Sequence, residues 1–440
     1  MRIVFASLGF VALMGLSSGA EEVPAKSAKD ALAPLPILRI DEIHAGSPSM
    51  PALPVGIDDN RIPEPPLLTF SSDYLNWRMR RVPITVPLLV ERRLGGQFIG
   101  PTELNPGRFS GLGISGQLWV SRDRRFGLEG SGRFFEQRSD FDSLTSEVDG
   151  LPQYERPFRS NLGNATILVP VSVPGQLSGR FEIATKSRFA SGDGGLVVRL
   201  WESPTGTFRL QGSVGYRHQY LRESLNLEQT SLSIAAGSVL NLGELGTLGT
   251  GAGYRISDQL EVVNRFNGAQ LGLRGKCEYH SFTLLLGAKT AFGTNQRTLN
   301  ASGSTVLLPP QSTSVTEEAA TTTTVLPGGV ISPATSTGLF VGSANRGIAH
   351  RSAGSFLVEG TLEVGYQVTD RFQVRMGYSG LYWTSVSRPG QLLDPTIDPR
   401  QLPISSRFDP SASGANRPGV LFSTSNFYAH GWTLGAEWSY

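Results

Sequence analysis

The sequence is nearly free of cysteine. Cys277 is the only cysteine among 440 residues, so neither an internal disulfide framework nor a cysteine-based metal site can form. The simplest interpretation of Cys277 is a small apolar side chain on a strand. Lysine is also scarce, with five among the 39 basic residues, and the net charge of +2 does not supply the basic surface that nucleic-acid binding requires.

Long apolar runs are absent beyond the first residues. No later segment has 18 uninterrupted apolar residues, which excludes a membrane protein built from helices. At the start, Arg2 precedes an apolar run over residues 3–16, and small residues follow at 18–20. This pattern predicts a cleaved signal peptide over 1–20 and hence export. The run is too short to be an anchor that spans a bilayer.

Glycine is abundant and charge is moderate. The chain has 52 glycines, 17% charged residues and a mean hydropathy of -0.10, which suits strands that are apolar on one side only, although a soluble all-β secreted protein would have a similar composition. Residues 21–68 contain repeated prolines without a sustained period, and they predict a flexible periplasmic lead-in. Between residues 69 and 440, stretches of about ten residues alternate between apolar and polar side chains, which predicts strands.

The alternating segments predict a closed antiparallel transmembrane β-barrel. In 208–219, Phe208, Leu210, Val214 and Tyr216 fall on one face and polar residues on the other. Ten such segments, from 69–79 to 428–440, are joined by connections that alternate strictly between short and long, as expected of periplasmic turns and extracellular loops. The long connections are 80–108, 138–190, 222–260, 296–352 and 386–427. Twelve strands is the alternative, because 180–187 could form another strand.

Two further segments carry expectations of their own. Residues 302–337 are rich in Ser, Thr, Ala and Pro, which predicts a mobile extracellular loop. At the other end, the chain finishes on an aromatic residue within an alternating strand. Thr433, Gly435, Trp438 and Tyr440 are similar to the terminal-strand signal that the bacterial barrel-assembly machinery recognises, although an edge strand with interfacial aromatics would have the same alternation.

Several motifs in fixed order resemble one family. They are Ser72 to Trp77, Gly215 to Arg217 with Leu221 to Leu225, Asn264 to Gly272, and Gly377 to Trp383 continuing into Val386 to Gly390. These segments, spread over residues 70–440, are similar to family seven of the putative beta-barrel porins, which is associated with planctomycete-type bacteria. The resemblance implies an outer-membrane barrel and brings no substrate with it. The run after Gly390 is less polar than that family's pattern, and the Thr-rich insert near 321 departs from it.

Charged residues of opposite parity to the apolar stripes are expected to face the lumen. The candidates are Arg199, Arg209, Arg217, Arg274, Lys276, Lys289, Glu359, Glu363, Arg375 and Glu437. In an open lumen these charges would set ion preference. A barrel of ten strands is only slightly wider than one filled by its own side chains, so the same charges could instead pair across the lumen as a plug.

No pattern of enzyme chemistry is present. The five histidines include His218 and His430, and none belongs to a local metal or nucleophile motif. We therefore expect no catalytic residue, metal or cofactor. The sequence predicts a porin-like outer-membrane barrel, with passive diffusion of small polar solutes as one hypothesis. The alternatives are a closed structural barrel, adhesion or recognition through the long loops and, last, an outer-membrane hydrolase. The expected partners are outer-membrane lipid and the barrel-assembly machinery.

Overall fold

The computed structural model describes residues 65–92, 103–105, 107–235, 240–242, 245–310, 335–409, 411 and 416–440. The predicted signal peptide and the lead-in up to residue 64 lie outside the described residues. Within the described part, no helix has the length and apolar character needed to cross a bilayer.

The barrel strands are β1 (Leu68–Met79), β5 (Arg108–Trp119), β6 (Phe126–Phe135), β10 (Leu177–Glu202), β11 (Phe208–Ser233), β14 (Gly253–Tyr279), β15 (Phe282–Leu308), β16 (Gly347–Thr369), β17 (Phe372–Val386) and β19 (Ser425–Ser439). The remaining elements are β2 (Val82–Pro83), β3 (Val90–Glu91), β4 (Glu103–Leu104), β7 (Arg138–Thr145), β8 (Tyr154–Ser160), β9 (Thr166–Pro170), β12 (Leu240–Asn241), β13 (Thr247–Leu248), β18 (Thr396–Ile397) and the short 3-10 helices η2 (Pro389–Gln391) and η3 (Pro399–Gln401).

Ten strands form a closed antiparallel ring. They follow the order β1, β5, β6, β10, β11, β14, β15, β16, β17, β19, and β19 pairs again with β1. At the seam, the backbone N–H of Tyr440 donates to the carbonyl of Leu68 at 2.8 Å, and the N–H of Leu68 donates to the carbonyl of Tyr440 at 3.0 Å. The predicted ten-stranded barrel is therefore confirmed. The alternative of twelve strands fails because residues 180–187 are part of β10.

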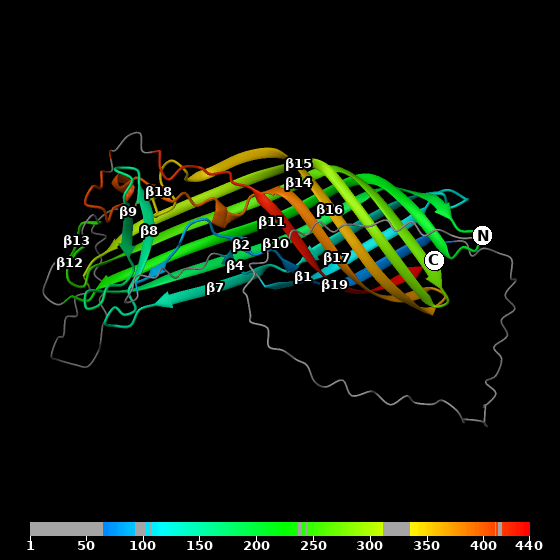
Figure 1. Cartoon of the computed structure of the whole chain (residues 1–440), viewed down its shortest axis with the longest axis horizontal. Coiled ribbons are helices and arrows are strands. Elements are labelled where there is room, and N and C mark those ends of the chain that lie inside the picture. Colours follow the sequence, from blue (N-terminus) through cyan, green and yellow to red (C-terminus); the bar gives the residue numbers. More distant parts are fainter. Residues whose placement is uncertain are drawn as a thin grey trace, which may run out of the picture. The chain divides into compact units, whose positions relative to one another are not determined.

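Four neighbouring strands extend far beyond the length that a membrane requires. Strands β10, β11, β14 and β15 have 26 or 27 residues each, whereas about 9–11 residues of tilted strand cross a bilayer. In Figure 1 these strands run from the end that holds the C-terminus to a group of short strands at the opposite end. The segments 177–190, 222–233, 253–260, 296–308 and 347–352 were predicted as connections and are strand instead.

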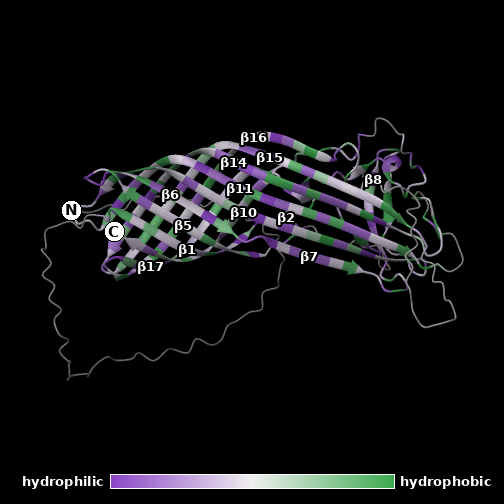
Figure 2. Ribbon diagram, turned by 180° about the vertical axis from the view of Figure 1, so that it is seen from behind, coloured by the Kyte–Doolittle hydropathy of each residue, from purple (hydrophilic) through white to green (hydrophobic). Residues whose placement is uncertain are grey.

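The predicted strands were too short because the apolar side chains move from the outer face to the inner face along each long strand. Near the short turns, the outward side chains of β11 are apolar, and Val214 and Tyr216 are 50% and 54% exposed. Beyond Gln219 the inward side chains become apolar, with Leu221, Leu225 and Leu227 fully buried. Figure 2 shows the alternation of hydrophobic and hydrophilic residues along the strands. A strand surrounded by lipid has its apolar side chains on the outer face, whereas a strand surrounded by water has them on the inner face.

The far end of the molecule is a folded cap. We use this name for the sheet of β18, β8, β3 and β9, the β12–β13 hairpin and the segments 335–346 and 387–409. These parts share one apolar core with the extended strands, including Phe181, Leu225, Phe340 and Leu393. At the N-terminal cap of η3, burial alone would raise the pKa of the Asp398 carboxyl, but hydrogen bonds from Arg400 outweigh this effect and hold that pKa below its ordinary value.

The Ser/Thr-rich segment is only partly a loop. Residues 302–308 belong to β15, and Thr335 and Thr305 form a backbone bridge. The side chain of Thr337 donates to the carbonyl of Gln401 at 3.0 Å, which ties this segment to the cap. Residues 311–334 lie outside the described part of the chain. The predicted loop over 302–337 is therefore wrong over 302–308, which is strand.

Candidate functional site

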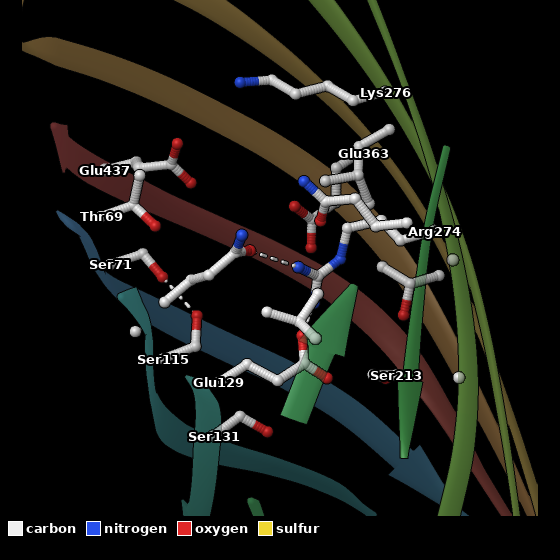
Figure 3. Close-up of a pocket in the computed structure, with 18 of the residues that line it drawn as sticks. Thr69, Ser71, Ser115, Glu129, Ser131, Ser213, Arg274, Lys276, Glu363 and Glu437 are labelled. Atoms are coloured by element: carbon white, nitrogen blue, oxygen red, sulfur yellow. Dashed lines mark hydrogen bonds and ion pairs between the residues drawn. The ribbon is translucent and has the colours of Figure 1, made fainter. Parts of the chain in front are cut away.

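The barrel encloses a polar cavity in the half that holds the short turns. The cavity has a free volume of about 190 Å³, and Thr69, Trp119 and Thr283 are among its lining residues near the strand ends. Figure 3 shows side chains from several strands reaching into it, with the hydroxyls of Ser71 and Ser115 toward one another at 2.6 Å. We call this space the lumen cavity.

Most of the predicted lumen residues come together here. The lumen cavity is lined by Arg209, Arg274, Lys276, Lys289, Glu359, Glu363, Arg375 and Glu437. They lie on six strands, and each has the inward parity opposite to an apolar outer stripe. Ion pairs join them to their neighbours, as in Arg274 with Glu129 at 3.2 Å and Lys276 with Glu278 at 2.9 Å.

Two predicted lumen residues lie elsewhere. Arg199 bonds to Glu202 at 2.8 Å and to the carbonyl of Asp123, so it is held at the short-turn rim rather than in the cavity wall. Arg217 is completely buried and lies outside the cavity lining. Alternation predicts the inward direction of both side chains but not their height along the barrel.

A buried ion-pair cluster surrounds Arg217. Its guanidinium donates to Asp193 at 3.1 Å and to Glu359 at 2.6 Å. Glu359 also accepts from Arg133 at 2.6 Å, and Asp193 accepts from Lys289 at 2.7 Å. Side-chain exposure in these five residues is between 0% and 18%. Charges taken this far out of water require partners of opposite sign, and the cluster supplies one for each of them.

A second cluster surrounds Arg375 on β17. Its guanidinium contacts Asp73 at 2.7 Å, Glu363 at 3.3 Å and Glu437 at 3.3 Å. The three carboxylates come from β1, β16 and β19, so one cation links four strands across the seam of the barrel. Planar guanidinium groups suit such multiple contacts better than lysine does.

Three members of these clusters, Asp73, Arg133 and Asp193, were not among the predicted lumen residues. Asp73 and Arg133 have inward parity relative to the stripes of Tyr74 and Phe134, so the alternation could have found them. Asp193 stands among glycines at 192, 194 and 195. These glycines carry no apolar signal of their own, and only the stripe that starts at Leu196 gives Asp193 its inward parity.

An apolar layer crosses the lumen above the ion pairs, toward the cap. We call it the closure layer, and its members are Leu75, Trp77, Met79, Phe109, Phe135, Phe189, Leu221, Phe266, Ala291, Leu357, Leu381, Trp383, Val386, Phe427 and Ala429. Every one of the ten barrel strands contributes at least one of these residues. Each is at most 5% exposed, so the layer fills the cross-section of the barrel.

Aromatic rings form a continuous series within the closure layer. Ring centroids are 5.3 Å apart for Trp77 and Phe135, 5.5 Å for Phe135 and Phe189, and 5.8 Å for Phe189 and Phe427. The series continues through Trp383, 6.2 Å from Phe427. These are normal separations for packed aromatic pairs. Immediately beyond, the buried Arg388 pairs with Glu223, which places another charged layer before the core of the cap.

The residues of the predicted assembly signal lie on the closing strand β19 or, for Tyr440, directly after its last residue. Thr433 is buried and Gly435 is opposite Asp73 on β1. Trp438 contacts the rings of Phe70 at 6.2 Å and Phe372 at 5.4 Å, and Tyr440 is 62% exposed. These positions put the terminal aromatics where β19 meets both of its neighbours.

The two histidines considered for hydrolysis bond to an amide and to a phenol hydroxyl. His218 bonds through Nδ1 to the Asn267 side chain at 2.8 Å, and the Nδ1 of His430 bonds to the hydroxyl of Tyr378. Among the described residues, no group of three or more His, Cys, Asp or Glu side chains is arranged to hold a metal ion.

Comparison with solved structures returns outer-membrane barrels. The outer membrane protease OmpT from Escherichia coli is similar at 9% identity and a TM-score of 0.34, with 85% of this chain and 96% of that chain covered. The P. putida toluene transporter TodX is similar at 8% identity and a TM-score of 0.20, with 86% of this chain and 91% of that chain covered. An anion-selective porin from Comamonas acidovorans is similar at 9% identity and a TM-score of 0.16, with 84% of this chain and 99% of that chain covered. Scores this low carry no argument about function.

No curated protein matches the chain. The family model described as "Putative beta barrel porin-7" matches residues 97–440, which include nine of the ten barrel strands. The family resemblance found in the sequence is thereby confirmed, and it agrees with the closed ring of strands and its lipid-facing apolar stripes. The chain belongs to the family "Putative beta barrel porin-7".

Proposed function

We propose that this porin-like outer-membrane barrel is closed to solutes and that it works through the cap, which it holds on the outer side of the membrane for adhesion or recognition. The carrying observation is the closure layer, because residues from all ten strands fill the lumen with apolar side chains. Buried ion pairs lie directly below it and a further pair lies above it. Water and ions have no continuous polar path through such a stack.

The outward direction of the cap follows from the connections. The long connections and the cap are at one end, and short turns such as the one between Tyr279 and Phe282 are at the other. Long loops face the outside in outer-membrane barrels. We further propose export through a cleaved signal peptide over 1–20, insertion guided by the terminal strand, and no enzymatic activity.

The second candidate function is passive diffusion of small polar solutes. The charged lining of the lumen cavity favours it, since Arg209, Lys276 and Glu437 would bias permeation by charge. This function requires the closure layer to open.

Planar-bilayer recording on the purified protein separates the two functions. We expect no conductance steps, because the closure layer is packed across the whole lumen. The variant Trp77→Ala/Phe427→Ala removes two of its rings, and Tyr428→Ala, an outward aromatic on β19, is the matched control. Stable unitary steps from the unmodified protein would establish diffusion and refute the closed barrel.

A further inference from the structure

A trough runs across the lipid-facing wall of the barrel. Glycine pairs form its floor, because Gly116 on β5 is opposite Gly130 on β6, and Gly132 is opposite Gly192 on β10. These positions have the same outward parity as the exposed Leu112, Leu118 and Leu196. The wall is therefore hollowed where other outward positions carry bulky apolar side chains.

The trough is apolar and large enough for an acyl chain. Its volume is about 580 Å³. Phe70 lies at one end, Ile114 and Phe134 form the side, and His218 and Tyr220 lie at the other end. An apolar trough in the membrane-facing wall suits a hydrocarbon chain, because lipid is the solvent there.

A basic groove adjoins the trough on the side of the cap. It has a volume of about 290 Å³, and Lys186, Arg188 and Arg222 line it together with Glu261. Arg188 is the next outward residue on β10 after Ala190, and Arg222 is the next outward residue on β11 after Tyr220. Ala190 and Tyr220 both line the trough, so trough and groove meet at the upper edge of the apolar belt.

The groove has an excess of unpaired positive charge. Arg188 and Arg222 are directly opposite one another across β10 and β11, a placement of like charges that destabilises a sheet unless something compensates it. Arg222 has a carboxylate partner in Glu261 at 2.6 Å. In the part of the chain that the structure describes, neither Lys186 nor Arg188 forms an ion pair. One lysine and two arginines against one glutamate give a net charge of +2.

We propose that this wall binds one phosphorylated lipid of the outer leaflet, with an acyl chain in the trough and a phosphate in the basic groove. The site lies on the outer surface, so it is independent of whether the lumen conducts. Clusters of Lys and Arg at a membrane surface attract anionic headgroups. A hydrocarbon trough that ends at a cationic groove recognises both parts of one molecule.

Native mass spectrometry of the full chain in detergent tests the headgroup. The probe is lipid A, a diphosphorylated and multiply acylated disaccharide, and phosphatidylcholine is the zwitterionic comparison. We expect retention of lipid A over phosphatidylcholine, and about a tenfold or greater loss of lipid A affinity in Lys186→Gln/Arg188→Gln. The control Arg180→Gln/Arg255→Gln makes the same change of charge at exposed outward positions above the groove, and its affinity should stay within about twofold.

The trough is tested by filling it. A Cβ atom at Gly192 would lie 3.7 Å from the nearest atom, the Ser131 carbonyl oxygen, and a Cβ at Gly360, an outward position on β16, would have nothing within 4 Å. Both glycines therefore accept a side chain without strain. Gly192→Leu should weaken lipid A binding about tenfold, whereas Gly360→Leu should not change it.

Inorganic phosphate distinguishes a lipid from a free anion. We expect lipid A to bind far more tightly than inorganic phosphate, and Gly192→Leu to affect lipid A alone. Equal binding of phosphatidylcholine would overturn the proposal, as would unchanged lipid A binding in Lys186→Gln/Arg188→Gln. Phosphate that binds as well as lipid A, together with no effect of Gly192→Leu, would make the site a free-phosphate site and refute the lipid.

Discussion

Single charges in the lumen stabilise this barrel only as members of clusters. Glu359 is buried between Arg133 and Arg217, each at 2.6 Å. Burial of an ion pair gains little by itself, because desolvation offsets the attraction, but loss of one partner strands the other charge in a medium of low dielectric. We therefore expect removal of one partner to destabilise the protein much more in a buried ion pair than in an exposed one.

The substitution Glu359→Gln tests this asymmetry. It leaves two buried guanidinium groups without this carboxylate, and we expect a loss of about 3–5 kcal/mol in the free energy of unfolding. Urea titration in lipid vesicles, followed by tryptophan fluorescence, measures the change. Glu228→Gln breaks the exposed pair with Arg255 at 3.4 Å and should cost less than about 1 kcal/mol. Equal losses in the two variants would show that the cluster has no special role.

A charged residue of the site could be predicted from the sequence where apolar residues next to it show which positions of the strand face outward. Arg375 and Glu363 lie in segments with a clear apolar stripe, and alternation alone put them in the lumen. Asp193 lies among glycines, which carry no such signal. The partners of each charge were not predictable, because Arg217 and Glu359 are 142 residues apart and their contact depends on the register of strands between them.

The long strands of this protein pass from lipid into water partway along their length. The turn-side halves were predictable, since lipid demands an apolar outer stripe of membrane-spanning length. The cap-side halves were not, because there the apolar residues move to the inner face and the stripe ends. On β10, for example, the outward Leu196 gives way to the inward Phe181 and Ile183. An inversion of parity within one alternating run is the sequence signal for such an extended strand.

The end of the last strand closes the barrel at its seam with β1. Tyr440 forms both backbone hydrogen bonds of the final step of the seam with Leu68, so its deletion shortens the closing pair and exposes strand edge to lipid. We expect less folded protein in the outer membrane, measured as the heat-modifiable fraction on a gel. Removal of the exposed side chain alone, in Tyr440→Ala, keeps those backbone bonds and tests the aromatic signal separately. Normal levels of folded protein from the deletion would contradict the role of this residue.

The barrel and its cap form a stack of layers along one axis. From the short turns upward it has the lumen cavity, the ion-pair cluster of Arg217, the closure layer, the Arg388–Glu223 pair and the apolar core of the cap. The outer surface changes from apolar to charged as the interior changes from charged to apolar. The ten strands could be predicted from alternation and connection lengths, but the cap could not, because its short strands assemble from connections that are distant in sequence.

The most direct test of this account is a depth measurement along β11. A single spin label is placed at the outward positions Val214 or Asn226, after Cys277→Ser removes the native thiol. Accessibility of each label to oxygen and to a water-soluble nickel chelate is then compared in lipid vesicles. We predict that the label at 214 reports lipid and the label at 226 reports water. Lipid at 226, or water at 214, would contradict a strand that leaves the membrane at the point where its alternation inverts.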